Sequence, residues 1–244
     1  MFAKKQYYTG IDGCRGGWLL TTLNEQQELK IYLFSSLSEA KELIDSSKHI
    51  SIDMPMGLVS SQDEERICDA LIRKELGKGF GSSVFGVPCR QAVYASSYQE
   101  ANKINREVLN KGLSIQTWNI CSKIEELDVF LQQNPEYKIL FTEGHPELCF
   151  KRLKGEGLMF KKKHNEGVQE RLQLLRKCKQ DIQREFEIFN ARFLKKWVST
   201  DDVLDSMGLA FNAREIAENN YTIFPRQIVL DKNKIPMNVF VAEW

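Results

Sequence analysis

The chain has 244 residues, of which 42% are hydrophobic and 27% are charged. These are the values of an ordinary globular protein, and 15 glycines with 6 prolines are too few for a fibrous or disordered chain. A formal net charge of +1 argues against a protein that coats nucleic acid through a strong basic excess.

The sequence gives no sign of a membrane or an oxidising compartment. The first residues lack the apolar run of a signal peptide, and no window approaches 18 uninterrupted apolar residues. The six cysteines include no C-x-x-C pair, so neither a zinc ribbon nor a disulfide framework is indicated. We therefore expect a cytoplasmic protein with reduced cysteines and no membrane partner.

The first 53 residues predict a β-meander, one helix and a fourth strand. Apolar alternation and turn residues place these elements, in chain order, at 7–11, 18–23, 29–34, 37–44 and 49–53. The Met-Pro pair that follows ends the fourth strand, because proline cannot donate a ladder hydrogen bond.

A long insertion is expected before the fifth strand. About 80 residues separate the fourth strand from the apolar stretch 138–142, far more than one crossover needs. Helical periodicity within this stretch predicts helices at 61–76, 98–109 and 122–132. We expect a single domain, 1–244, with insertions at about 56–136 and 144–198.

The C-terminal half predicts three helices and a hairpin. The helices are expected at 166–177, 181–195 and 201–218, the last capped by Ser199 or Thr200, and the hairpin at 227–241. Together the elements predict an α/β fold whose mixed five-stranded sheet combines a three-stranded meander with two parallel strands.

Acidic residues fall at the ends of these elements. Asp12, Asp53 and Glu143 end the first, fourth and fifth strands, while Asp202 and Asp205 share one face of the last long helix. If the three strands are parallel neighbours, their acids meet at one sheet edge. Taken singly, the aspartates at the strand ends could be turn residues, and the one at position 202 could be favoured by the helix dipole. The carboxylate at position 205 lies within an apolar helix and needs a partner.

Hard oxygen donors of this kind suit Mg²⁺ or Mn²⁺, and such a cluster would repel itself without a cation. Two ions about 4 Å apart would activate a water and stabilise the leaving oxygen in phosphodiester hydrolysis. The sequence therefore predicts a metal-dependent hydrolase, with Asp12, Asp53, Asp202 and Asp205 as ligands and a nucleic acid or nucleotide as substrate.

Other side chains could contact a proton or a phosphate. His145, in E-G-H-P-E, is a proton carrier or phosphate contact, or else a structural histidine. Ser82 and Ser83, with Arg73 and Arg90 on either side, offer an anion site or form an ordinary loop.

Two basic features could either contact phosphate or lie at the solvated surface. Residues 151–179 contain ten Lys or Arg against three Glu, with Lys163 among them, and form either a phosphate-facing patch or a solvated helical face. Arg15, in the glycine-rich turn after the first strand, contacts a phosphate or lies at the surface.

Several motifs resemble one family over almost the whole chain. In order, they are GIDGCRGGW, SIDMPMGL, SSVFGVPCR, SKIEELD, EGHPELCF, KKKHNEGVQERLQLL and DDVLDSMGLAFNA. They are similar to the domain of unknown function 429 family, predicted nucleases with a three-layer ribonuclease H-like fold. The roles of Glu143 and His145 as catalytic residues depend on this resemblance alone.

The last helix also resembles that of Holliday-junction resolvases, whose D-x-x-D-A-x-x-x-A pattern supplies two metal ligands. That likeness implies ligand roles for Asp202 and Asp205, with Asp12 and Asp53 as the strand ligands. Two positions depart from it: Asp53 stands where the resolvases have Glu, and Ser206 replaces an alanine.

Two other functions remain open at this stage. A non-catalytic binding module could keep the fold, which would suit the near-neutral charge and long insertions. An actin-like ATP phosphotransferase shares the core fold, but such enzymes generally need two copies of it, and 244 residues have room for one.

Overall fold

The computed structural model describes residues 6–244, which divide into two compact units. The sheet unit comprises residues 6–53, 140–222 and 240–244, and the helical unit comprises 54–139 and 223–239. The stretch expected as a first insertion, 56–136, falls in the helical unit. The second, 144–198, falls in the sheet unit.

The sheet unit contains most strands and the longest buried helix. Its elements are β1 (Tyr7–Cys14), β2 (Gly17–Asn24), β3 (Leu29–Phe34), α1 (Lys41–Asp45), β4 (Ser47–Asp53), β5 (Phe141–Glu143), α6 (Pro146–Lys154), α7 (Asn165–Leu175), α8 (Ile182–Arg192) and α9 (Thr200–Ala217). The short strands β6 (Tyr221–Phe224) and β7 (Val239–Ala242) lie where the chain passes between the two units.

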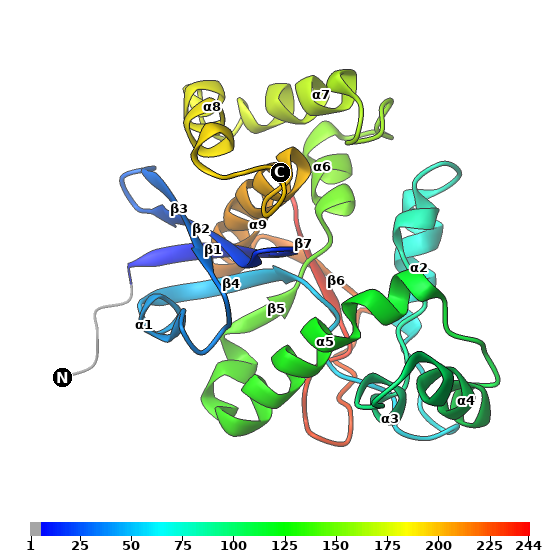
Figure 1. The fold of residues 1–244 in the computed structure, drawn as a ribbon. Coiled ribbons are helices and arrows are strands. Elements are labelled where there is room, and N and C mark those ends of the chain that lie inside the picture. Colours follow the sequence, from blue (N-terminus) through cyan, green and yellow to red (C-terminus); the bar gives the residue numbers. More distant parts are fainter. Residues whose placement is uncertain (1–5) are drawn as a thin grey trace. The chain divides into compact units, whose positions relative to one another are not determined.

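The described residues form one sheet of seven strands in the order β3-β2-β1-β4-β5-β7-β6 (Figure 1). Strands β1, β2 and β3 are an antiparallel meander, and β4 pairs parallel with both β1 and β5, as predicted. The predicted count of five strands is wrong, because the four-residue strands β6 and β7 extend the sheet. Of the expected hairpin at 227–241, one bridge forms, between Leu230 and Pro236.

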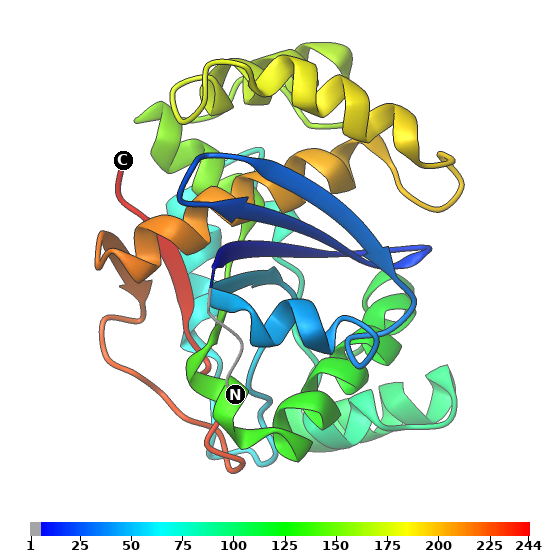
Figure 2. The same ribbon diagram turned by 90° about the vertical axis from the view of Figure 1, so that its left-hand side faces the viewer.

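Helices cover both faces of the sheet within its unit. Helix α9 packs on β1, β2 and β4, with α6, α7 and α8 around it, and α1 lies on the opposite face (Figure 2). Helix α9 approaches β1 at backbone distance, since a Cβ on Gly10 would lie 2.1 Å from the Ser206 carbonyl oxygen and 2.3 Å from the Ala210 nitrogen. Only glycine fits at this point of β1.

Local sequence sets the start of α9. The Ser199 side chain accepts from the Asp202 N–H, and the Asp202 carboxylate accepts from the Ser199 N–H, which is a capping box. The helix is buried along most of its length, and the Ser206 hydroxyl bonds that of Thr21 on β2 at 2.8 Å. The helix therefore has a fixed start, rotation and depth against the sheet.

Several predicted boundaries were wrong. The expected helices 37–44, 61–76 and 122–132 are α1 at Lys41–Asp45, α2 at Ile67–Leu76 and α5 at Ile115–Gln133. The expected strand 138–142 begins only at Phe141, because Pro135–Ile139 is a 3-10 helix. Helix α6 was not predicted: Pro146 starts it and Gly155, with φ 84°, ends it.

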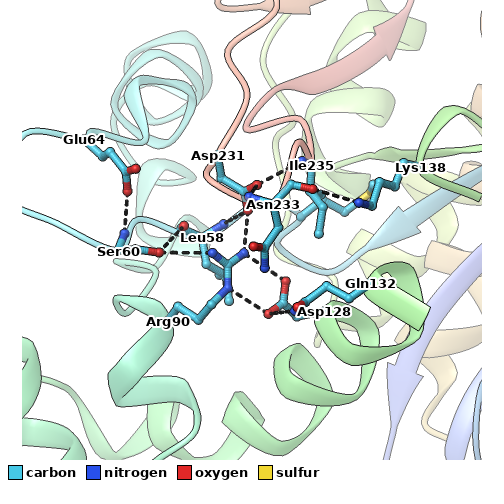
Figure 3. A network of polar contacts seen from close by, with 12 residues as sticks. Leu58, Ser60, Glu64, Arg90, Asp128, Gln132, Lys138, Asp231, Asn233 and Ile235 are labelled. Carbon is cyan, nitrogen blue, oxygen red and sulfur yellow. Dashed lines mark hydrogen bonds and ion pairs between the residues drawn. The ribbon is translucent and has the colours of Figure 1, made fainter. Parts of the chain in front are cut away.

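The helical unit contains an apolar cluster and, next to it, a polar network. Helices α3 (Arg90–Val93), α4 (Tyr98–Leu109) and α5 enclose a cluster of small apolar residues: Cys89, Ala92, Ala101 and Leu113. Beside it, Arg90 lies between Asp128 and Asp231 (Figure 3). No helix within residues 6–244 is both long and apolar enough to cross a membrane.

Candidate active site

Asp12 and Asp53 lie side by side at one end of the sheet. They are register partners in the parallel strands β1 and β4, which places their backbones about 4.8 Å apart. Side chains two residues apart in a strand share a face. Gly10 touches α9, and Ser51 accepts a hydrogen bond from Asn212 of α9 at 2.9 Å, so both aspartates face this helix.

Helix α9 presents a third carboxylate to the same place. Asp205 is 1% exposed, and its Oδ1 atom has no hydrogen-bond partner. Asp202, one turn earlier, uses Oδ2 to accept the Ser199 N–H at 2.7 Å. The other oxygen of Asp202 remains open to a ligand.

These carboxylates disfavour one another's ionisation. Burial raises the pKa of Asp12 well above its ordinary value, and the charges of Asp53 and Asp205 raise it further. Burial also raises the pKa of Asp53 to about 6 and that of Asp205 to about 7, although a nearby lysine opposes both shifts. Buried aspartates with raised pKa values, close to a charged partner, make this cluster a candidate functional site.

The lysine is Lys162, which the sequence did not indicate. Its ammonium group donates to Asp205 Oδ2 and lies 3.9 Å from Asp201 Oδ2, with the side chain 29% exposed. Burial alone would lower the pKa of Lys162, but the charges of Asp205, Asp12 and Asp53 raise it above its ordinary value. Lys162 is therefore an ammonium ion surrounded by carboxylates.

The loop that presents Lys162, residues 157–164, is held against α7; we call it the lysine loop. Glu170 accepts the Met159 and Phe160 N–H groups at 3.0 Å, and Arg171 Nη1 donates to the Phe160 carbonyl at 3.0 Å. Arg171, fully buried, also forms an ion pair with Glu147 of α6 at 2.5 Å. Both the N–H groups and a carbonyl group of the loop are therefore held by α7 just before Lys162.

The structure does not bring Glu143 to the aspartates. Glu143 pairs in register with Ile52, which alternates with Asp53 and so points to the other face of the sheet. His145 is the N-cap of α6, and its Nδ1 accepts the Leu148 N–H at 3.4 Å. The capping contact gives this histidine a structural role.

Two of the predicted phosphate contacts lie at the surface of the sheet unit. Arg15 and Lys163 are both exposed. Trp197, which the sequence did not indicate, is bonded to the turn that contains Arg15. Its carbonyl accepts the Gly16 N–H at 3.0 Å, and Trp197 is 47% exposed. The ammonium of Lys196 lies 4.9 Å from the Trp197 ring.

The remaining predicted residues belong to the helical unit. Arg73 donates to the Val84 carbonyl at 2.8 Å, Ser83 donates to the Phe80 carbonyl at 2.7 Å, and Ser82 is exposed. Arg90 is engaged by buried Asp128 and Asp231. Internal contacts account for the position of both arginines without a bound anion.

Whether the aspartates fit a metal ion can be judged from their chemistry and arrangement. Carboxylate oxygens suit a hard divalent cation, and the unpartnered Oδ1 of Asp205 offers one buried acceptor. Within residues 6–244, however, no three His, Cys, Asp or Glu side chains are arranged to hold an ion as they stand. The donor set fits a divalent cation in kind, while Lys162 already neutralises part of it.

Comparison with known proteins identifies a family. A family model described as a protein of unknown function (DUF429) matches residues 10–228, which include every residue of this site. Neither the curated proteins nor the solved structures yielded a match.

Proposed function

We propose that this chain, which belongs to the DUF429 family, is a metal-dependent hydrolase of phosphodiester bonds with a ribonuclease H-like fold. The meander followed by two parallel strands, in the order β3-β2-β1-β4-β5, supports that fold. The observation that supports the activity best is Asp205, a buried carboxylate on α9 that faces Asp12 and Asp53 with one oxygen unsatisfied.

Asp12, Asp53 and Asp205 would hold the cation, Mg²⁺ or Mn²⁺, and the free oxygen of Asp202 would complete the set. A divalent ion in such a site lowers the pKa of a bound water and stabilises charge on phosphate oxygens. The protein supplies rigid carboxylates: β1 and β4 fix two of them in register, and the contact of α9 with Gly10 fixes the third.

A nucleic acid is the substrate that the surroundings of the site favour. Arg15 and Lys163 offer exposed cations for phosphates, and Trp197 offers an exposed ring on which a base can stack. Trp197 is bonded to the turn that directly follows the strand bearing Asp12. The proposed phosphate and base contacts are thus close in sequence to the site: Arg15 follows the strand that carries Asp12, Lys163 follows Lys162, and Trp197 precedes α9.

The test is cleavage of labelled single-stranded and duplex DNA and RNA with Mg²⁺ or Mn²⁺. Asp12→Asn and Asp205→Asn should each reduce the rate by about 10²-fold or more, the loss typical of removing one electrostatic partner of the reaction. Asp45→Asn, at the exposed end of α1 on the opposite face, is the matched control. Undiminished cleavage by a double variant of Asp12 and Asp205 would overturn the proposal.

One observation favours a second candidate, a binding module without catalysis. Lys162 already compensates Asp205 without any metal ion. If the module is correct, the protein binds oligonucleotides in the presence of EDTA and shows no affinity for Mn²⁺ at millimolar concentration. Metal-dependent cleavage would exclude it.

A further inference from the structure

The carboxylates of the site and the ammonium of Lys162 are unequal in charge. Asp12, Asp53 and Asp205 can each bear a negative charge, and Lys162 supplies one positive charge to them. Its ammonium bonds Oδ2 of Asp205, whereas Oδ1 of the same carboxylate keeps no donor. The lysine therefore neutralises the cluster only in part.

Lys162 extends to the cluster from the lysine loop, whose backbone packs tightly against α7. A Cβ on Gly167 would lie 2.1 Å from the Lys161 carbonyl oxygen, so α7 and the lysine loop touch at backbone distance directly before Lys162. With the bonds from Glu170 and Arg171, this contact aims one of three consecutive lysines inward while Lys161 and Lys163 remain exposed. The position of the ammonium is a product of the fold.

The attachment of the ammonium itself is easier to undo. A lysine side chain is flexible and mobile, unlike a planar guanidinium that bonds in a fixed fork. With 29% of it exposed, the side chain of Lys162 can turn to solvent while the backbone of the lysine loop keeps its bonds to α7. Loss of the ammonium leaves the carboxylates close together without a counter-ion, which is the condition that favours a divalent cation.

We propose that Lys162 is a built-in counter-ion that competes with a divalent cation for Asp205 and its neighbours, and leaves the carboxylates when the cation binds. This inference depends on the proposed metal-dependent function, since it concerns the same cluster.

The test is calorimetric titration of the EDTA-treated full chain with Mn²⁺. Lys162→Met should lower the Kd for Mn²⁺ by about tenfold or more, because the ion no longer has to displace an ammonium in contact with a carboxylate. Lys163→Met, which removes the exposed neighbouring lysine, should leave the Kd within about twofold of that of the wild type. An equal or weaker affinity of the Lys162 variant would overturn the inference.

A second variant covers the case in which Lys162→Met does not fold. Glu170→Ala removes the acceptor of the Met159 and Phe160 N–H groups and so loosens the lysine loop without touching the cluster. It should also bind Mn²⁺ more tightly than the wild type. An unchanged Kd in this variant, or no Mn²⁺ binding by any of the proteins, counts against the inference.

The two proposals can fail separately. If the wild type cleaves a phosphodiester with Mn²⁺ and Lys162→Met shows no gain in affinity, the function stands and the competition does not. If Lys162→Met gains affinity and neither protein cleaves any nucleic acid, the competition stands and the hydrolase proposal falls.

Discussion

The cluster around Arg90 in the helical unit and the cluster around Lys162 in the sheet unit both combine opposite charges, and they differ in how completely their atoms are satisfied. In the helical unit, Arg90 donates through Nε and Nη2 to both oxygens of Asp128, at 2.9 and 3.0 Å, and through Nη2 to Asp231 at 2.5 Å. Backbone N–H groups complete Asp231: Leu58 donates to one oxygen and Ile235 to the other. In the sheet unit, one ammonium faces several carboxylates, and Asp205 Oδ1 has no donor.

The extent of hydrogen bonding distinguishes the two clusters. A buried ion pair whose hydrogen bonds are all made joins segments and leaves nothing for a ligand. The Arg90 network joins the loop after β4, α3, α5 and the segment before β7. Burial and, after it, the neighbouring charges raise the pKa values of the carboxylates around Lys162, so keeping them together costs stability at neutral pH.

The largest expected effect is on the structural cluster. Arg90→Met should lower the free energy of unfolding by about 3–5 kcal/mol, because it leaves two buried carboxylates without their cation. Arg73→Met, which removes an exposed arginine with one backbone contact, should cost under about 1 kcal/mol. Urea unfolding followed by circular dichroism measures both. A similar loss of unfolding free energy in the two variants would contradict a structural role for the Arg90 cluster.

The same substitution should have opposite signs in the two clusters. Asp128→Asn should destabilise the protein by about 3 kcal/mol, because Arg90 loses a charged partner. Asp12→Asn should instead stabilise the metal-free protein at pH 8, because it removes a carboxyl group whose ionisation is opposed by burial and by the charges of its neighbours. Urea unfolding of both variants in EDTA, over the same urea concentrations as the wild type, measures the two changes in the free energy of unfolding.

The gain from Asp12→Asn should depend on pH. The folded-state pKa of Asp12 is raised, so ionising it costs stability as pH rises above its ordinary pKa, and at low pH the wild type keeps the proton. The advantage of the variant therefore grows as pH rises from the ordinary pKa of an aspartate toward pH 8, and it disappears near pH 4. A gain that stays constant from pH 4 to pH 8 would show that packing, not charge, is its cause.

A smaller effect is expected at the surface beside the carboxylates. Trp197→Ala should weaken binding of a single-stranded oligonucleotide about tenfold, the loss of one stacked base. Trp244→Ala, which removes another exposed tryptophan of the sheet unit, is the matched control. Fluorescence anisotropy in EDTA measures binding without cleavage. Equal effects of the two variants would remove Trp197 from the proposed substrate site.

Sequence patterns predicted the parts of the site that depend on strand ends. Asp12 and Asp53 could be found because parallel strands end at one edge, and Asp205 because a carboxylate in an apolar helix needs a partner. Glu143 could not be placed, since a strand's two faces differ by one residue and β5 begins three residues later than expected. Its face depends on pairing with β4.

The other errors have physical causes of the same kind. Three lysines in a row look alike in the sequence, and it is the contact of Gly167 with Lys161 that turns Lys162 inward. Arg90 resembles an anion contact until Asp128 and Asp231 meet it, from 38 and 141 residues away. Strands of four residues, such as β6 and β7, are too short to show a periodicity.

The contact between Gly10 and α9 has a consequence for inheritance. A Cβ at this position would lie 2.1 Å from a backbone oxygen of α9, so the separation of Asp12 from Asp205 is set by main chain meeting main chain. Every amino acid that a single base change can produce from a glycine codon has a Cβ. Any such missense mutation at codon 10 would therefore force α9 away from β1 and separate the aspartates without altering either of them.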